Sequence, residues 1–148
     1  MATVKQLIDK KGDGTNYVVA CTDQVINALK IMAEANVSAI MVTEDDKVVG
    51  IFTERDYSRK GELQGLSAKN TPVQNLMTEQ MMTVTPETSI DQCMELMKQY
   101  RIRHLPVVEK NTMIGMVSMR DVVDTLLADR ESEIIGMQNY FLGTDFAT

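Results

Sequence analysis

The sequence contains no tryptophan, a single histidine, two cysteines and no long apolar run. One histidine has no evident partners for metal ligation or for His-based nucleophilic catalysis. Cys21 and Cys93 lie far apart without CxxC spacing, which excludes a disulfide framework and a zinc motif and predicts reduced thiols. The apolar runs are far shorter than the roughly 20 residues of a membrane span, and the charged Lys5 and Asp9 do not fit a signal peptide. We therefore expect a cytoplasmic protein with no membrane partner.

An excess of basic residues is also missing. The chain has 15 lysines and arginines against 21 carboxylates, a formal net charge of -6. Nucleic-acid surfaces neutralise phosphates with clustered basic side chains, so we expect no nucleic-acid partner, although this balance still allows a local phosphate site. The 148 residues, 44% apolar and 24% charged, are typical of one compact globular domain or two very small ones. The 12 methionines indicate a soft, adaptable core or contact surface.

The sequence does contain an internal repeat. Residues 19–57 align with residues 84–122 without a gap, at a constant offset of 65. Identical pairs include Met32 and Met97, Val42 and Val107, Gly50 and Gly115, Arg55 and Arg120, and Asp56 and Asp121. A fainter echo relates residues 4–8 to residues 73–77, just before each copy. Because a unit of about 60 residues is marginal alone, we expect the two copies to pack on each other as a pseudo-twofold pair.

Each copy is predicted to fold as strand, helix, strand, strand, helix. Apolar residues at i, i+3, i+4 and i+7 mark one helix face per copy: Val25, Ala28, Leu29 and Met32, then Ile90, Cys93, Met94 and Met97. Short apolar runs separated by polar turn residues predict hairpins over 39–52 and 105–117. The expected opening strands are 17–21 and 82–85, and the second helices begin near Glu54 and Met119.

The expected domain limits follow from the repeat. Residues 1–67 form the first repeat with its lead-in, 68–130 the second, and 131–148 a C-terminal helix and tail. A loop rich in Gly, Ser, Asn and Thr connects the repeats over 60–72. The terminal helix is predicted over 132–142, separate from a helix over 119–127. Together these helices offer contiguous apolar side chains, which predicts a symmetric homodimer.

The most closely repeated stretches, 50–56 and 115–121, lead from a strand into a helix. A Thr or Ser followed three residues later by Asp is a helix capping box, which needs no ligand. The same positions also suit a nucleotide, because a helix N-terminus attracts phosphate and a nearby Asp can accept hydrogen bonds from ribose hydroxyls. Arg55 and Arg120 add a positive charge where a helix alone would prefer an acid. Both interpretations stay open at this point.

These repeated stretches, together with Arg103-His104-Leu105-Pro106-Val107 and the lead-ins 4–8 and 73–78, resemble a tandem pair of CBS domains, the Bateman module, in its free-standing bacterial form. The resemblance covers nearly the whole chain. It implies a mixed α/β fold in which two β-α-β-β-α repeats, with three-stranded sheets, pack sheet to sheet around a pseudo-twofold axis. It further implies two clefts for adenine nucleotides.

The resemblance implies a set of residues for each cleft. One cleft takes Ser118, Arg120 and Asp121, with Arg103 and His104 reaching phosphate and Thr22, Val37 and Ser38 near the base. The other takes Thr53, Arg55 and Asp56, with Thr85, Ile102 and Arg103 opposite. The first copy lacks the Arg-His pair and the proline of the second, so we expect phosphorylated ligands to prefer the Asp121 cleft. Affinity there is expected to fall with rising salt, and with pH above about 6.5 as an unperturbed histidine loses its charge.

The expected function is therefore that of a regulatory ligand sensor and not of an enzyme. It would bind AMP, ADP, ATP or NAD(H) as a regulatory ligand, with no cofactor and no metal, and signal occupancy to its own oligomer or to an unidentified protein target. The alternative is a constitutive dimeric scaffold with empty clefts. An enzyme acting on a nucleotide through the cleft carboxylates is disfavoured, because no general base or metal cluster accompanies them.

Overall fold

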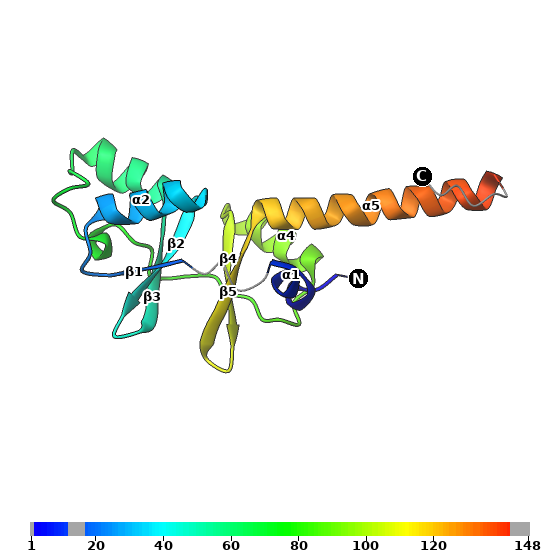
Figure 1. Cartoon of the computed structure of the whole chain (residues 1–148), viewed down its shortest axis with the longest axis horizontal. Coiled ribbons are helices and arrows are strands. Elements are labelled where there is room, and N and C mark those ends of the chain that lie inside the picture. The colour runs from blue at the N-terminus through cyan, green and yellow to red at the C-terminus, as the bar shows by residue number, and fades with distance from the viewer. Residues whose placement is uncertain (1, 12–16, 143–148) are drawn as a thin grey trace.

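The computed structural model describes residues 2–11 and 17–142, except for the side chains of residues 140–142. It confirms the mixed α/β fold with two small sheets and a C-terminal helix (Figure 1). The first repeat contains β1 (Val18–Ala20), α2 (Val25–Ala35), β2 (Ala39–Glu44), β3 (Lys47–Thr53) and α3 (Glu54–Asp56), which continues into η2 (Tyr57–Gly61) and η3 (Glu62–Gln64). The second contains α4 (Ile90–Tyr100), β4 (His104–Glu109), β5 (Thr112–Ser118) and α5 (Met119–Leu142). The lead-ins are α1 (Val4–Lys11) and η4 (Val73–Asn75).

The repeat extends to backbone conformation. Asn36 and Arg101, 65 residues apart, both end a helix in the left-handed region, with φ of 56° and 53°. The hairpin turns also match, since two consecutive residues with positive φ, 45–46 and 110–111, join the strands of each sheet. Consecutive positive φ angles give the turn whose twist suits a two-residue hairpin. The two copies therefore share a backbone path although their turn residues differ.

The second sheet is smaller than expected. The first sheet has the order β1-β2-β3, with β1 parallel to β2, whereas the second contains only β4 and β5. The predicted strand over 82–85 is reduced to a single parallel bridge between Val84 and Val107. In the first repeat the ladder continues because Cys21 N donates to Thr43 O at 2.8 Å. The equivalent residue in the second repeat is Pro86, which has no amide hydrogen to donate.

Each repeat completes the core of the other. Val73 and Leu76 of the second lead-in are buried among Val19, Phe52 and the other core residues of the first repeat. Conversely, residues 4 and 7 of α1 are buried in the core of the second repeat. The lead-ins thus pack across the predicted limits 1–67 and 68–130, and the domain limits themselves stay a prediction.

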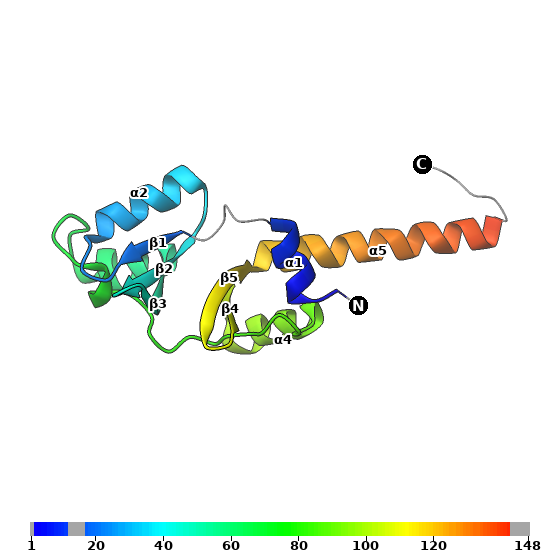
Figure 2. The same ribbon diagram turned by 60° about the horizontal axis from the view of Figure 1, so that its bottom comes forward.

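Two predictions about the helices are wrong in part. The expected loop over 60–72 is still helical as far as Gln64, and Gly65 ends it with a φ of 74°. The separate helices over 119–127 and 132–142 are one helix, α5, with 24 residues. The residues between them, Ala-Asp-Arg-Glu over 128–131, include no glycine or proline to stop it. Beyond the second repeat α5 extends away from the body of the molecule, as both views show (Figure 2).

Candidate functional site

Both repeated turns form the capping box predicted as the ligand-free interpretation. In the second repeat Ser118 N donates to Asp121 Oδ2 at 2.9 Å, and Asp121 N donates to Ser118 Oγ at 3.1 Å. In the first repeat the reciprocal bonds between Thr53 and Asp56 are both 3.0 Å. Each aspartate therefore stabilises the start of its helix, whatever else it binds.

The carboxylate of Asp56 is fully engaged by the protein. Oδ2 accepts the Thr53 amide, and Oδ1 accepts Thr78 Oγ1 at 3.1 Å and lies 3.1 Å from Lys60 Nζ. Asp56 is 8% exposed. Thr78 reaches it because the second lead-in runs along β3, where a Cβ on Gly50 would lie 2.9 Å from Thr78 O. The Asp56 cleft therefore offers little carboxylate to a ligand.

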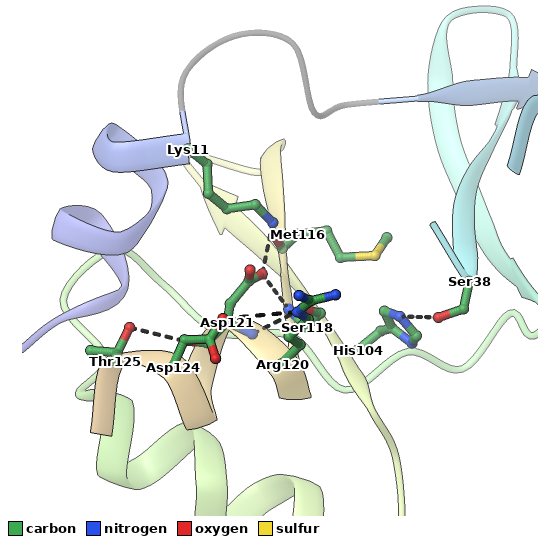
Figure 3. Close-up of polar contacts among 9 residues, drawn as sticks. All are labelled: Lys11, Ser38, His104, Met116, Ser118, Arg120, Asp121, Asp124 and Thr125. Carbon is green, nitrogen blue, oxygen red and sulfur yellow. Dashed lines mark hydrogen bonds and ion pairs between the residues drawn. The ribbon is translucent and has the colours of Figure 1, made fainter. Parts of the chain in front are cut away.

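The carboxylate of Asp121 accepts hydrogen bonds from Lys11 and Ser118 (Figure 3) and is more accessible than that of Asp56. Lys11 Nζ donates to Oδ2 at 2.7 Å and to Met116 O at 2.9 Å, and the Asp121 side chain keeps 23% exposure. No described residue forms a hydrogen bond to Oδ1. Burial alone would raise the pKa of Asp121, but the hydrogen bonds from Lys11 and Ser118 outweigh it and lower that pKa. Asp121 is therefore ionised at neutral pH.

His104 links the two repeats. It is the first residue of β4 and lies opposite Ser118 in the β4–β5 ladder. Its Nε2 is 3.2 Å from Ser38 Oγ of the first repeat, a contact visible in Figure 3. Burial lowers the pKa of His104 to about 4; the charges of Lys11, Arg103 and Arg55 lower it further, while Asp121 opposes them. His104 is therefore neutral at pH 7. The expected attraction of a charged His104 for phosphate would begin only at a pH well below 6.5.

The arginines of the two turns are held in different ways. Arg55 donates to the backbone oxygen of Arg101 at 3.1 Å, which ties the first repeat to the end of α4. Arg120 has 86% of its side chain exposed and lies 3.9 Å from Asp124 on the next turn of α5. Arg103 is exposed at the start of β4, and its backbone oxygen accepts the amide of Met119 at 2.8 Å. Within this group, Arg55 and Arg103 are close enough to His104 to shift its pKa.

The structure gathers part of the predicted residue set. Ser38, His104, Ser118 and Asp121 meet at the junction of the repeats. Val37 and Ile102 are half-buried and pack against the two cores, and Thr85 hydrogen-bonds to Thr88, so that their places in the clefts stay predictions. For Thr22 the structure shows no hydrogen bond to the predicted site residues among residues 2–11 and 17–142.

Three residues of the site were not predicted from sequence. Lys60 follows Asp56 by four positions, a helical spacing that could have indicated their ion pair. Thr78 lies in the second lead-in and Lys11 at the end of the first. A separation of 110 residues between Lys11 and Asp121 leaves no local signal, so only the fold shows that contact.

A separate groove of about 550 Å³ lies beside the first sheet, between the end of β2 and the second lead-in. Glu44 and Glu79 line it, so its charge does not suit a phosphate, and it contains none of the predicted site residues. Cys21 also lines it, and both cysteines are buried free thiols, as expected from packing. Burial raises the pKa of Cys93 to about 11, which keeps this thiol unreactive at neutral pH.

Within 2–11 and 17–142 no three His, Cys, Asp or Glu side chains lie close enough together to hold a metal ion. In the same residues no helix has the length and apolar character needed to cross a membrane.

Comparison with known proteins assigns the repeats. The CBS domain family matches residues 15–61 and 73–128. The mitochondrial CBS domain-containing protein CBSX3 of Arabidopsis thaliana is 40% identical over 149 residues, covering 95% of this chain and 72% of the relative. A solved protein with CBS domains from Burkholderia ambifaria MC40-6 is 43% identical with a TM-score of 0.83, covering 86% of this chain and 96% of that one.

A more distant solved structure contains a ligand. It is a CBS domain protein from Pyrobaculum aerophilum complexed with AMP, with 24% identity and a TM-score of 0.70, covering 80% of this chain and 88% of that one. At this identity the likeness shows the fold alone. The two matched segments and the closer relatives nevertheless settle the family: the chain belongs to the CBS-domain proteins and carries a tandem pair of CBS domains.

Proposed function

We propose that this CBS pair is a regulatory module that binds an adenosyl compound, AMP, ADP, ATP or NAD(H), at the Asp121 cleft. The observation that carries the proposal is the junction of the repeats, where one ionised carboxylate lies beside a group of cations. Lys11, Arg55 and Arg103 all act on His104, and Asp121 is the one acid among the charges that shift its pKa. A ribose hydroxyl acceptor next to positive charge is the arrangement that a nucleotide requires.

The proposed site crosses from one repeat to the other. Ser38 comes from the first repeat, as does Arg55, which the sequence had assigned to the other cleft but which acts on His104, whereas Arg103, His104 and Asp121 come from the second. A ligand bound by residues of both repeats would change the strength of the contact between the repeats. This change could transmit the binding of the ligand to an oligomer or a protein target. The fold is compatible with such a ligand, since the Pyrobaculum aerophilum protein of the same fold is complexed with AMP.

We further propose that the two clefts differ. The Asp56 side chain is 11% exposed and its carboxylate has protein partners on both oxygens, whereas the Asp121 side chain is 23% exposed and accepts protein hydrogen bonds on Oδ2 alone among the described residues. Phosphorylated ligands should therefore bind first at the Asp121 cleft. The module would perform no chemistry and reside in the cytoplasm, as its sequence led us to expect.

A constitutive scaffold remains the second candidate, and a specific observation favours it. Helix capping alone is a sufficient reason for an aspartate at both repeated positions. In addition, α5 exposes apolar side chains suited to self-association. In that case the clefts would stay empty at physiological nucleotide concentrations.

Isothermal titration calorimetry of the purified full chain with AMP, ADP, ATP, NAD(H) and adenosine tests the proposal. We expect saturable binding, tightest for a phosphorylated compound, and a matching rise in melting temperature, because a ligand that binds the folded state stabilises it. An assay for nucleotide turnover should show none. Absence of heat and of any thermal shift at millimolar ligand would instead support the scaffold.

A further inference from the structure

Lys11 is a cation of the Asp121 cleft that comes from outside both repeated motifs. It lies at the end of α1, and its Nζ is 2.7 Å from Asp121 Oδ2 and 2.9 Å from Met116 O. The side chains of Lys11 and Asp121 keep 26% and 23% of their exposure. A ligand entering the cleft can therefore reach this ion pair from solvent.

The lysine of the other repeat is held in a different way. Lys60 Nζ lies 3.1 Å from Asp56 Oδ1, 3.2 Å from Leu76 O and 3.2 Å from Thr78 Oγ1. It belongs to the same helical segment as Asp56 and joins that segment to the second lead-in. Lys60 therefore stabilises the packing around the buried carboxylate of Asp56, whereas Lys11 pairs with the accessible carboxylate of Asp121.

We infer that Lys11 is a specificity-determining residue. When a ligand binds, Lys11 breaks its ion pair with Asp121, whose carboxylate then binds the ribose, and forms a new ion pair with the ligand's phosphate. The inference rests on the proposed function. A ribose diol has two donors and engages both oxygens of a carboxylate, but Oδ2 already accepts Ser118 N and Lys11 Nζ. Of these two partners, the lysine side chain can leave without breaking the start of α5. Its flexible stem leaves the ammonium within reach of an anion in the same cleft.

This exchange predicts opposite effects on two ligands. Adenosine displaces Lys11 from Asp121, but it has no phosphate with which the freed ammonium group could form an ion pair. AMP displaces Lys11 but forms a new ion pair with it. Lys11→Met should therefore strengthen adenosine binding and weaken AMP binding, so that the preference for AMP over adenosine falls roughly tenfold.

The test measures the affinities of adenosine and AMP by calorimetry for the wild type and two variants of the full chain. Lys10→Met is the matched control, because it removes the same charge from an exposed neighbour on α1. Lys10→Met should keep the wild-type preference, while Lys11→Met loses it. In the wild type the ¹⁵Nζ resonance of Lys11 should shift on AMP addition, a readout that a structural role alone would not move.

The outcomes separate the inference from the function on which it rests. If the wild type binds AMP but Lys11→Met changes both affinities equally, or only lowers the melting temperature, Lys11 is structural and the inference is wrong. If Lys10→Met has the same effect as Lys11→Met, the effect is general electrostatics and the inference is also wrong. If the wild type binds neither ligand, the inference is overturned, and the titrations with ADP, ATP and NAD(H) decide the proposed function.

Discussion

At the scale of single residues, the two aspartates of the repeat show how one motif acquires two environments. Both form a capping box of nearly the same geometry. Asp56 is then covered by Thr78 and Lys60, whereas the contact of Asp121 with Lys11 remains accessible. The difference arises from the lead-ins and not from the motif, so a functional role must be tested at each aspartate separately.

Asp121→Ala should weaken AMP binding tenfold or more. A hydrogen bond to a charged acceptor contributes about 1.5–3 kcal/mol, and the variant removes this acceptor from the proposed ribose site. Loss of the hydrogen bond from the Ser118 amide to the Asp121 carboxylate should also lower stability by about 1 kcal/mol. Calorimetry gives the affinity, and Asp56→Ala, which loses the equivalent hydrogen bond, is the control. Unchanged affinity with a lower melting temperature would leave capping as the sole role of Asp121.

The stability of the protein should depend on His104 between pH 7 and pH 4. The pKa of His104 is about 4 in the folded chain against 6.5 for an ordinary histidine, because burial and the charges of Lys11, Arg103 and Arg55 outweigh Asp121. As the pH falls below 6.5 the unfolded chain binds a proton that the folded chain does not. The free energy of unfolding therefore falls over this window.

Urea unfolding at pH 7, 6 and 5 measures this effect. His104 is the one histidine in the sequence, so the difference between wild type and His104→Gln isolates its titration from that of the carboxylates. The wild type should lose stability relative to the variant as the pH falls. Parallel pH profiles would show that His104 titrates alike in the folded and unfolded chains.

Sequence alone predicted the residues that the motifs share but not those that complete the site. The structure brings Ser38, His104, Ser118 and Asp121 together, and their role in a nucleotide cleft stays a prediction. Lys11 was missed because its role depends on the packing of α1 against the opposite repeat, and no periodicity records such a contact. The pKa of His104 was also beyond sequence, since it depends on burial and on charges from three separate segments.

At the scale of elements, the repeat register predicted the order of helices and strands, and the exceptions have local causes. The opening strand of the second repeat shortens to one bridge where Pro86 replaces Cys21. The helical segment after β3 runs on as far as Gln64, where Gly65 in the left-handed region ends it. Each lead-in packs in the core of the other repeat. The weak sequence similarity between residues 4–8 and 73–77 indicated that the two segments are related, but not which core each one enters.

The exchanged lead-ins should couple the stabilities of the two repeats. Leu7 and Leu76 are 7% and 2% exposed and lie in opposite cores. Truncation of a buried leucine to alanine costs about 2–5 kcal/mol, so Leu7→Ala and Leu76→Ala should each destabilise the protein by this amount. Chemical denaturation monitored by circular dichroism measures the loss, and the exposed Lys5→Ala is the control. Because each core includes residues from both halves of the chain, unfolding should remain one transition; two separate transitions would contradict the coupling.

At the scale of the whole molecule, the outer part of α5 is distinctive because its apolar side chains are exposed. Its inner part is anchored by Val122, which is buried, and by Leu126, which packs against the core of the second repeat. Farther along, the helix projects away from both repeats (Figure 1). Val123, Leu127, Ile134 and Met137 are 37%, 56%, 55% and 58% exposed, and their spacing of four, seven and three residues places them on one helix face. Such a face usually marks an interface, and a second copy of the same helix offers the matching apolar surface.

We therefore expect the chain to form a homodimer through this face of α5. Ile134→Glu places a carboxylate in the middle of the face and should weaken dimerisation at least about tenfold, because an unpaired charge is costly to bury. Ser132→Glu adds the same charge two residues earlier, on the opposite side of the helix, and should leave association unchanged. Sedimentation equilibrium over a range of concentrations measures both variants against the wild type. A monomeric wild type at high concentration would remove the dimer, and equal dissociation by both variants would mean that charge, and not this apolar face, controls assembly.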